Sequence, residues 1–407
     1  MLDITSVRKE FPILNTRIRG EPLVYLDNGA SAQKPKCVIE AVTKGYEFEY
    51  SNVHRGLHYL SNLATEKFEA VREKIQRFIN ARSPEEIVFT SGATEGLNLI
   101  SYAWAENNLV EGDQIILSLA EHHSNIIPWH FLRERIGVSL KWVEPRPDGA
   151  LLAEDFISAM DEKTKLISVT QMSNVLGSIV DVKKICAAAQ SKNIISVIDG
   201  SQAAVHLPVN VQEIGCDFYV FTGHKLYGPS ASGATYIRKE RFDEMRPFLG
   251  GGAMINHVAK ENVSYNVAPY KFEAGTPAIV SIIGLGAAID FVEMLGRDSI
   301  LECERRLVEY TKNRLLGLDF LNIQGNSDDK GGIFSFTIRQ NKLHPHDVAT
   351  IIDQKGVAVR AGHHCAQPLL DHLGLTATCR ASIAIYNTED DIEKLIEALG
   401  YAIELVN

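Results

Sequence analysis

The chain has 407 residues, of which 45% are hydrophobic and 23% charged, and its formal net charge is −10. This length exceeds one ordinary core and predicts a soluble globular protein with a large domain and a smaller one. The acidic balance argues against nucleic-acid binding, which usually requires a basic face. No apolar stretch reaches membrane-spanning length and Met1–Ile4 begin no secretory signal, so we expect a cytoplasmic protein with no membrane role.

Over the first two thirds of the chain, strand-like apolar runs alternate with helical patterns. Strands are expected at 86–90, 114–118, 166–170 and 194–199, and helices from near Thr94 and over 182–191. Buried strands that alternate with helices are typical of a mostly parallel sheet with helices on both faces. The sequence therefore predicts an α/β fold for the larger domain.

The pattern changes after a predicted turn at Leu249–Gly252. Helices are expected over 277–295 and 301–316, followed by a separate α/β unit with strands at 333–338 and 356–360. We therefore predict an N-terminal segment over 1–20 that packs on the small domain, a large domain over 21–290 and a small C-terminal domain over 291–407.

Lys225 lies in Thr222-Gly-His-Lys-Leu-Tyr-Gly-Pro229, directly after an apolar run at 217–221. In open α/β sheets, the strand ends carry the ligands. A lysine amine becomes a nucleophile only when it loses its proton, and burial or nearby positive groups lower its pKa from ~10.4. A solvated lysine in a glycine turn is the structural alternative.

Three segments upstream have the chemistry of a site for a flat, anionic cofactor. Asp199 ends an apolar strand, where a carboxylate could pair with a protonated pyridine nitrogen, or could cap a helix. Thr90–Gly96 joins a strand to a helix with small residues, which suits a phosphate or a plain cap but matches no nucleotide motif. His122 could stack on an aromatic ring, whereas metal binding by His122 and His123 lacks further ligands at helical spacing.

The six cysteines are scattered without a Cys-x-x-Cys pair, which predicts neither a disulfide framework nor a structural zinc site. A buried, inert thiol is the ordinary state of such residues. Cys365 differs because Arg360, His363 and His364 make its neighbourhood polar and positive, which favours the thiolate. The cysteines are Cys37, Cys186, Cys216, Cys303, Cys365 and Cys379.

In this order the motifs resemble those of the class V aminotransferase group of fold-type I pyridoxal-phosphate enzymes, over nearly the whole chain. Within that group the chain resembles cysteine desulfurases of the SufS type. The resemblance implies a mostly parallel seven-stranded sheet in the large domain and a smaller α/β C-terminal domain. The motifs that carry it are 26–32, 52–56, 90–96, 121–123, 199–202, 222–229, 250–255, 360–368 and 380–382.

The resemblance implies pyridoxal 5'-phosphate as the cofactor, with Lys225 as the lysine that binds it covalently. His122 would stack on the ring and shuttle a proton, Asp199 and Gln202 would meet the ring nitrogen and hydroxyl, and Thr276 would reach the phosphate of a neighbouring subunit in a homodimer. The implied cofactor-binding residues are Ala93, Thr94, His122, Asn174, Asp199, Gln202, Thr222, His224, Lys225 and Thr276.

The resemblance further implies L-cysteine as the substrate and L-alanine as a product. Cys365 would receive the sulfur as a persulfide and hand it to an acceptor protein for iron–sulfur cluster assembly. The implied substrate-binding residues are Arg380, Arg360, Asn174 and His54.

Some features leave alternatives open. Cys379 stands before Arg380 where alanine is more usual, so we expect a second thiol near the site. The segment His344-Pro-His-Asp347 resembles one in enzymes that work with the zinc-bearing partner SufU, but it could simply start a helix, and a SufE-type acceptor is equally open. A selenocysteine lyase or a plain aminotransferase would need the same cofactor site, whereas a non-enzymatic scaffold would have lost Lys225 or Asp199.

Overall fold

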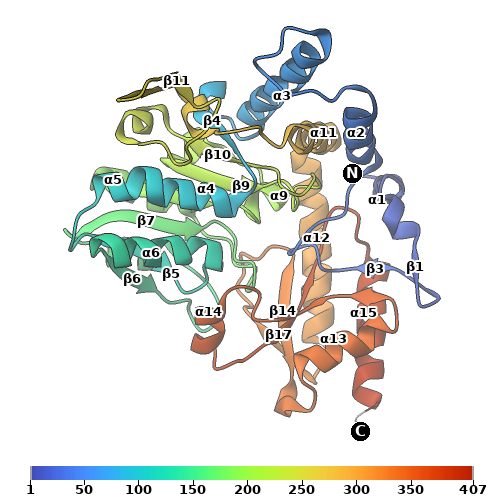
Figure 1. Ribbon diagram of the computed structural model, residues 1–407. Coiled ribbons are helices and arrows are strands. Elements are labelled where there is room, and N and C mark those ends of the chain that lie inside the picture. Colours follow the sequence, from blue (N-terminus) through green and yellow to red (C-terminus); the bar gives the residue numbers. More distant parts are fainter. Residues whose placement is uncertain (1, 406–407) are drawn as a thin grey trace.

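The computed structural model describes residues 2–405 and is built around one large twisted sheet (Figure 1). Its seven strands lie in the order β4-β10-β9-β8-β7-β5-β6, and only β10 runs antiparallel to its neighbours. The predicted mostly parallel seven-stranded sheet is therefore confirmed. The strands are β4 (Ile87–Thr90), β5 (Gln114–Ser118), β6 (Ser139–Val143), β7 (Thr164–Thr170), β8 (Ile195–Asp199), β9 (Phe218–Thr222) and β10 (Gly233–Ile237).

Helices cover both faces of this sheet because its central strands are apolar on both sides. Successive residues of β5 point to opposite faces: Ile115 and Leu117 join one core, whereas Ile116 joins the other. Leu97 of α4 packs into the first core and Ile185 of α8 into the second. The helices around the sheet are α3 (Tyr59–Phe78), α4 (Ala93–Leu99), α5 (Glu106–Asn108), α6 (Ile127–Ile136), α7 (Ala153–Ala159), α8 (Val182–Ser191), α9 (Ala203–His206) and α10 (Val211–Ile214).

A second, antiparallel sheet forms the centre of the C-terminal part, in the order β13-β14-β17-β16. Its apolar face packs on α13 and α15 through residues such as Phe336, Val348, Ile352 and Leu395. The elements are β13 (Leu321–Gln324), β14 (Ile333–Ile338), β16 (Arg360–Gly362), β17 (Thr378–Ser382), α13 (Pro345–Asp353), α14 (Gln367–His372) and α15 (Glu389–Glu404).

The expected single strand at 356–360 is wrong, because the chain divides there between two sheets. Residues 357–358 form β15, which pairs in parallel with β3 (Val24–Tyr25), and β16 begins at Arg360 beside β17. The strands expected at 114–118 and 333–338 and the helix at 182–191 have the predicted bounds. A short apolar run gives no sign of which partner each half will find, because pairing depends on distant strands.

Two long helices join the parts of the molecule. α11 (Ile279–Leu295) packs against α2 (Lys36–Phe48) and α3, and after a bend of 77° α12 (Arg297–Leu316) runs into the C-terminal part (Figure 1). Gly296 lies at the bend with a φ of +82°, a conformation that favours glycine. Among residues 2–405, no single helix is long and apolar enough to cross a membrane, and α11 and α12 reach that length and composition only as a bent pair.

The N-terminal residues contact the C-terminal part. In α1 (Ile4–Lys9), the Arg8 guanidinium donates to the carboxylate of Asp391 at 2.8 Å and to the carbonyl of Tyr386 at 2.9 Å. β3 also lies there, through its pairing with β15, although it falls in the predicted large domain. The predicted limit near 290 falls inside α11, and the three-part division stays a prediction.

The remaining elements are short. They are the strand pairs β1 (Arg17–Ile18) with β2 (Glu21–Pro22) and β11 (Ile255–Val258) with β12 (Val263–Tyr265), and the turns of helix η1 (Pro12–Asn15), η2 (Pro84–Glu86), η3 (Ile100–Ala105), η4 (His123–Asn125), η5 (Lys239–Glu244), η6 (Tyr270–Phe272) and η7 (Arg339–Asn341).

Phe11 fastens the N-terminal segment to both parts of the molecule. Its ring is fully buried, with centroids 4.5 Å from Tyr386, 5.7 Å from Phe291 and 5.9 Å from Tyr227. Phe11→Ala should lower the free energy of unfolding by about 3–5 kcal/mol, because it leaves a cavity among three rings. Denaturant unfolding measures this loss. Ile13→Ala, at a 41% exposed position of the same segment, should cost about 1 kcal/mol or less, and an equal loss in both variants would contradict the assignment.

Candidate active site

A cavity of about 280 Å³ opens at the carboxyl ends of the parallel strands, where the C-terminal part meets the large sheet. Ligands of open α/β sheets bind at this edge, because the loops that follow the strands converge there. The cavity brings together the predicted site residues except His54 and Thr276. Those that line it are Ala93, Thr94, His122, Asn174, Asp199, Gln202, Thr222, His224, Lys225, Arg360, Cys365 and Arg380.

The start of α4 forms one wall of the cavity. No side chain caps this helix, so the N–H groups of its first turn are not satisfied by a capping residue. Gly92 precedes it with a φ of +150°, and a side chain there would approach the Thr222 hydroxyl at 3.1 Å. The hydroxyls of Thr94 and Ser124 contact each other at 2.7 Å beside this turn. Free N–H groups and hydroxyls at a helix start are suited to bind a phosphate.

Lys225 follows β9 and lines the same cavity. Burial is the main cause that lowers the pKa of its amine to about 8; Asp199 opposes this shift, and Arg380 and Arg360 contribute to it. A substantial fraction of the amine is therefore neutral near physiological pH. This fraction is what a nucleophilic lysine requires, and it sets Lys225 apart from a solvated lysine in a turn.

Asp199 ends β8 and is buried at the floor of the cavity. One carboxylate oxygen accepts hydrogen bonds from the N–H of Ser201 at 2.9 Å and from its hydroxyl at 2.5 Å. The alternative that Asp199 caps a helix is wrong, because Gln202 occupies the cap position of α9. The Gln202 side-chain amide donates to the carbonyl of Gly29 at 2.8 Å, which fixes it at the cavity wall.

His122 lies at the end of the loop after β5, with its Nδ1 accepting from the N–H of Ser124 at 3.1 Å. Burial lowers the pKa of its imidazole to about 3, with smaller contributions from Lys225, His123 and Arg380. The ring is therefore neutral at physiological pH. A neutral ring can stack on a flat cofactor, and the role of His122 in proton transfer stays a prediction. Among the residues described, no group of three or more His, Cys, Asp or Glu side chains could hold a metal ion.

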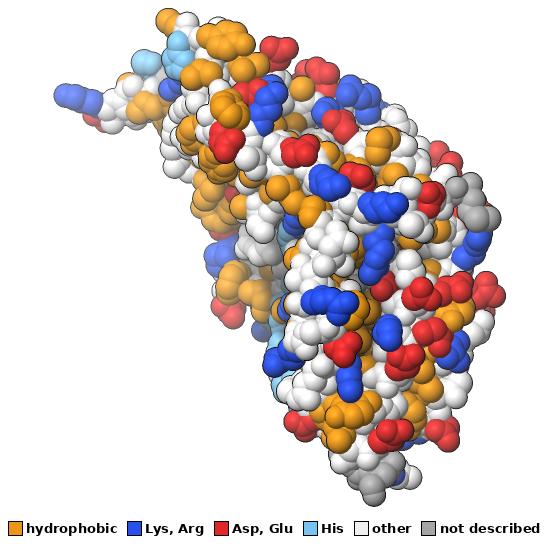
Figure 2. All heavy atoms as spheres, turned by 90° about the vertical axis from the view of Figure 1, so that its right-hand side faces the viewer, with side chains coloured by type: hydrophobic (Ala, Val, Ile, Leu, Met, Phe, Trp, Pro, Cys, Tyr) orange, Lys and Arg blue, Asp and Glu red, His pale blue; other side chains and the backbone are white. Residues whose placement is uncertain are grey.

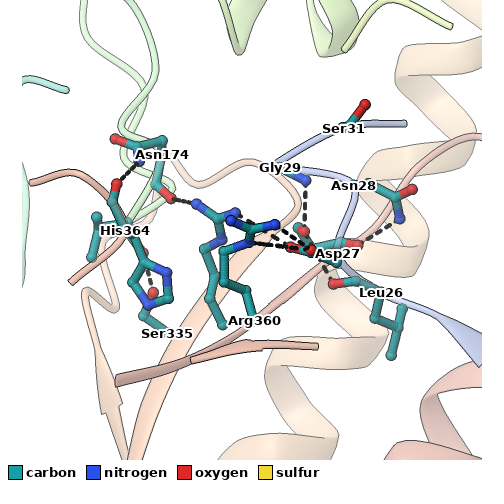
Figure 3. A network of polar contacts seen from close by, with 12 residues as sticks. Leu26, Asp27, Asn28, Gly29, Ser31, Asn174, Ser335, Arg360 and His364 are labelled. Carbon is teal, nitrogen blue, oxygen red and sulfur yellow. Dashed lines mark hydrogen bonds and ion pairs between the residues drawn. The ribbon is translucent and has the colours of Figure 1, made fainter. Parts of the chain in front are cut away.

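Two arginines from the C-terminal sheet reach the cavity, and Asp27 binds both. Arg360 is half-exposed and its guanidinium donates to the Asp27 carboxylate at 3.0–3.2 Å, as Figure 3 shows. Arg380 is buried, lies 3.6 Å from the same carboxylate, and donates to the Asn174 carbonyl at 2.9 Å.

The Nε of Arg380 is buried without a hydrogen-bond partner in residues 2–405, and burial lowers the pKa of this guanidinium to about 10. A buried donor without a partner is costly, so Arg380 is prepared to bind an anion in the cavity. In Arg360, by contrast, both Nε and Nη2 donate to the Asp27 carboxylate.

Cys365 is exposed at the rim of the cavity, in the loop between β16 and α14. His364 and Cys365 have φ angles of +52° and +55°, a left-handed conformation that costs non-glycine residues of the order of 1–3 kcal/mol each. The loop is held from outside: the N–H of His123 donates to the Cys365 carbonyl at 2.6 Å, and the Asn174 amide donates to the His364 carbonyl at 2.8 Å.

The expectation of a second thiol near the site is wrong. Cys379 is buried in the core between β17 and α13, where its thiol contacts the carbonyl of Pro345 at 3.0 Å. Successive residues of a strand point to opposite faces of the sheet. Because Arg380 faces the cavity, its neighbour Cys379 points away from it. Burial raises the pKa of the Cys379 thiol to about 12, which makes it unreactive.

His54 and Thr276 lie outside this cavity. His54 lines a separate pocket of about 190 Å³ with Tyr270 and Glu273, and its Nε2 contacts the Glu69 carboxylate at 2.8 Å. Thr276 is exposed beside the same pocket, between Gly275 and Pro277, which line it. Within one chain, neither residue contributes to the cavity that holds Lys225.

Several residues of the site were not assigned a role from the sequence. Ser201 orients Asp199, Ser124 contacts both Thr94 and His122, and Asp27 pairs with the two arginines. Each of them lies within or beside one of the sequence motifs that carry the family resemblance. The roles of these three residues could not be read from the sequence, because hydrogen bonds between distant segments leave no local pattern.

The lowered pKa of Lys225 predicts a distinct pH profile of chemical labelling. In protein freed of bound cofactor, a small acylating reagent should modify the Lys225 amine half-maximally near pH 8, because only the neutral amine reacts. Modification should increase as pH rises and the proton is lost. Lys34, whose pKa burial also lowers to about 8, is an internal reference, whereas an ordinary exposed lysine titrates near ~10.4. Mass spectrometry quantifies each site, and a Lys225 midpoint above pH 10 would contradict the assignment.

The sequence matches the aminotransferase class-V family over residues 24–395. A protein of Halalkalibacterium halodurans, named probable cysteine desulfurase, is 46% identical over 394 residues, which cover 97% of this chain and 96% of that protein. A cysteine desulfurase of Shigella flexneri is 45% identical over 397 residues, with 97% of both chains covered.

Solved structures agree over the whole chain. The crystal structure of the cysteine desulfurase CsdA, in S-sulfonic acid form, from Escherichia coli has a TM-score of 0.92 and 34% identity, with 100% of both chains covered. The apo structure of a cysteine desulfurase from Thermococcus onnurineus NA1 also has a TM-score of 0.92, with 37% identity, 100% of this chain and 98% of that chain covered. The protein belongs to the class V aminotransferase family.

Proposed function

We propose that this protein is a pyridoxal-phosphate-dependent cysteine desulfurase that converts L-cysteine to L-alanine and leaves a persulfide on Cys365. The observation that carries the proposal is the exposed Cys365 thiol on the rim of the cavity that also holds Lys225 and Arg380. A plain aminotransferase would have no use for a thiol there. The names of relatives that are 45–46% identical over nearly the full chain support the same activity.

The donors around the cavity fit pyridoxal phosphate. The uncapped start of α4, with Thr94 and Thr222, suits its phosphate, and the Asp199 carboxylate suits a protonated ring nitrogen. The neutral His122 offers a flat face for the ring, and the Lys225 amine suits the aldehyde. When bound, the cofactor supplies an electron sink that stabilises negative charge developing at the substrate Cα.

Three residues of the protein bind the substrate, transfer its protons and accept its sulfur. Arg380 binds the substrate carboxylate through its unpaired Nε, which fixes the Cα near Lys225. The Lys225 amine, neutral in part near pH 8, removes the Cα proton and returns protons to the product. The Cys365 thiolate attacks the substrate sulfur, so that one S–S bond forms as the C–S bond breaks. The electrons of the broken bond stay with the carbon that becomes the alanine methyl group, and no external oxidant is needed.

We also propose that two copies associate as a homodimer. Large apolar side chains around α2 and the start of α3 lie in water in the single chain, among them Leu57 at 99% exposure and Tyr59 at 76%. Figure 2 shows hydrophobic side chains over the upper part of this face, with charges of both signs among and below them. Exposed apolar patches of this kind are typical of subunit interfaces. The exposed Thr276 is free to reach the phosphate site of the second copy.

The persulfide on Cys365 must leave before the next turnover, and its exposure lets the thiol of an acceptor protein approach it. We propose an acceptor of the SufE or SufU type and iron–sulfur cluster assembly as the destination of the sulfur. The segment 344–347 begins α13, with the His344 ring accepting from the N–H of His346 at 3.3 Å. His346 is exposed beside Gly362 and is available to a zinc-bearing partner.

Cys365→Ala separates desulfuration from cofactor binding. The variant should keep the visible absorption of the bound cofactor but lose persulfide formation and sulfide release from L-cysteine, because no other thiol lines the cavity within residues 2–405. With selenocysteine it should retain activity, since the weaker C–Se bond breaks without thiolate attack. Cys379→Ala is the matched control and should form persulfide at the wild-type rate. Unchanged desulfuration by Cys365→Ala would refute the proposal.

The two arginines should differ in their effect on cysteine use. Arg380→Ala removes a charge-assisted carboxylate contact worth roughly 1.5–3 kcal/mol, so kcat/KM for cysteine should fall about ten- to a hundredfold. Arg360→Ala should have the smaller effect, because the Nε and Nη2 of Arg360 already donate to Asp27, whereas the buried Nε of Arg380 has no partner among residues 2–405. Steady-state kinetics with both variants measure the contrast. If Arg360→Ala proved the more damaging, the substrate carboxylate would have to be assigned to Arg360 instead.

A further inference from the structure

His123 contacts the loop that carries Cys365 at two points. Its backbone N–H donates to the Cys365 carbonyl at 2.6 Å, and its ring Nε2 accepts from the N–H of Gln367 at 3.0 Å. The first contact is independent of the side chain, whereas the second requires an acceptor at the position of Nε2. His123 follows β5 of the large sheet, so both bonds cross between the two parts of the molecule.

The His123 ring supplies an acceptor that the side chains of the loop itself do not provide. Gln367 begins α14, and no side chain caps this helix, so the Gln367 N–H would otherwise be one of the unpaired donors of the first turn. Immediately before it, His364 and Cys365 both have left-handed backbone angles. Bonds on both sides of Cys365 therefore keep the thiol at the cavity rim: Asn174 holds His364 on one side (Figure 3), and the His123 ring holds Gln367 on the other.

The His123 ring must be neutral at Nε2 to accept this bond, because a protonated nitrogen can only donate. Burial and the neighbouring His363 ring, 5.7 Å away between centroids, lower the pKa of His123 and favour that neutral state. The ring does not line the cavity around Lys225, so it has no direct contact with the reacting atoms.

We propose that His123 is a positioning residue for sulfur transfer, which holds the Cys365 loop over the cavity through the Nε2 bond to Gln367. The inference rests on the proposed desulfurase function and deepens it. The side chain of His123 should matter only for the attack of the Cys365 thiolate on the substrate sulfur. The cofactor site and the substrate carboxylate contact should not depend on it.

His123→Leu removes the acceptor, and His123→Gln places an amide oxygen within reach of the same N–H. His372→Leu is the matched control, because His372 is exposed at the end of α14 and does not line the cavity. The persulfide on Cys365 is followed by mass spectrometry in a single turnover with L-cysteine. Loss of one neutral hydrogen bond should slow its formation roughly two- to tenfold in His123→Leu, with His123→Gln close to wild type.

Two further measurements distinguish positioning from a general structural role. Cofactor absorption and turnover of selenocysteine, which does not require Cys365 attack, should be the same in His123→Leu and wild type. Amide hydrogen exchange of the peptide 363–370 should be faster in His123→Leu than in wild type, and it should be unchanged in His123→Gln and His372→Leu. Equal slowing with both substrates, loss of cofactor absorption, or wild-type rates of persulfide formation in His123→Leu would each overturn the proposal.

The exchange measurement needs no substrate. It therefore tests the role of His123 independently of the proposed desulfurase function. If wild-type protein made no alanine from L-cysteine, the desulfurase function would fail. Faster exchange of 363–370 in His123→Leu would still support the loop contact, and unchanged exchange would overturn it.

Discussion

The carboxylate of Asp27 lies between two arginines of the C-terminal sheet, and the geometry of the site depends on this arrangement. Asp27 follows β3, which pairs with β15, while Arg360 and Arg380 stand on neighbouring strands and face each other in register. Without the carboxylate, two positive charges would lie together at a partly buried position, which is costly. Arg380 in turn contacts the Asn174 carbonyl after β7, so the same cluster joins the small sheet to the edge of the large one.

Burial then assigns a protonation state to each group around the cavity. It lowers the pKa of Lys225 to about 8 and that of His122 to about 3, because both lose hydration and both lie near positive charge. The result is an amine that can lose its proton and a ring that remains neutral. Buried Glu121, whose pKa burial raises to about 7, contacts Ser118, Asn125 and the N–H of Thr170 beneath them and keeps the loops after β5 and β7 together.

The contrast between Cys365 and Cys379 illustrates how position in the fold decides reactivity. Both thiols lie within a few residues of Arg360 or Arg380 in the sequence. Cys365 is in a loop that the fold holds open at the cavity rim, and it is exposed. Cys379 is in a strand whose alternation points it into an apolar core, where its thiol stays protonated. Proximity in sequence to a functional arginine was therefore a poor guide to function.

The sequence by itself determined the parallel sheet and the segments that follow its strands, and the resemblance of its motifs to a known family supplied most of the residues that meet in the cavity. Apolar runs and glycine-containing strand ends are local signals, and they placed Lys225, Asp199 and the Thr90–Gly96 segment correctly at one edge. Only the tertiary structure decided how β15 and β16 divide, which face Cys379 takes, and that Asp27 and His123 hold the arginines and the cysteine loop. Those features arise from strand pairing and hydrogen bonds between distant segments, such as Asp27 and Arg360, which are 333 residues apart, and no local pattern records them.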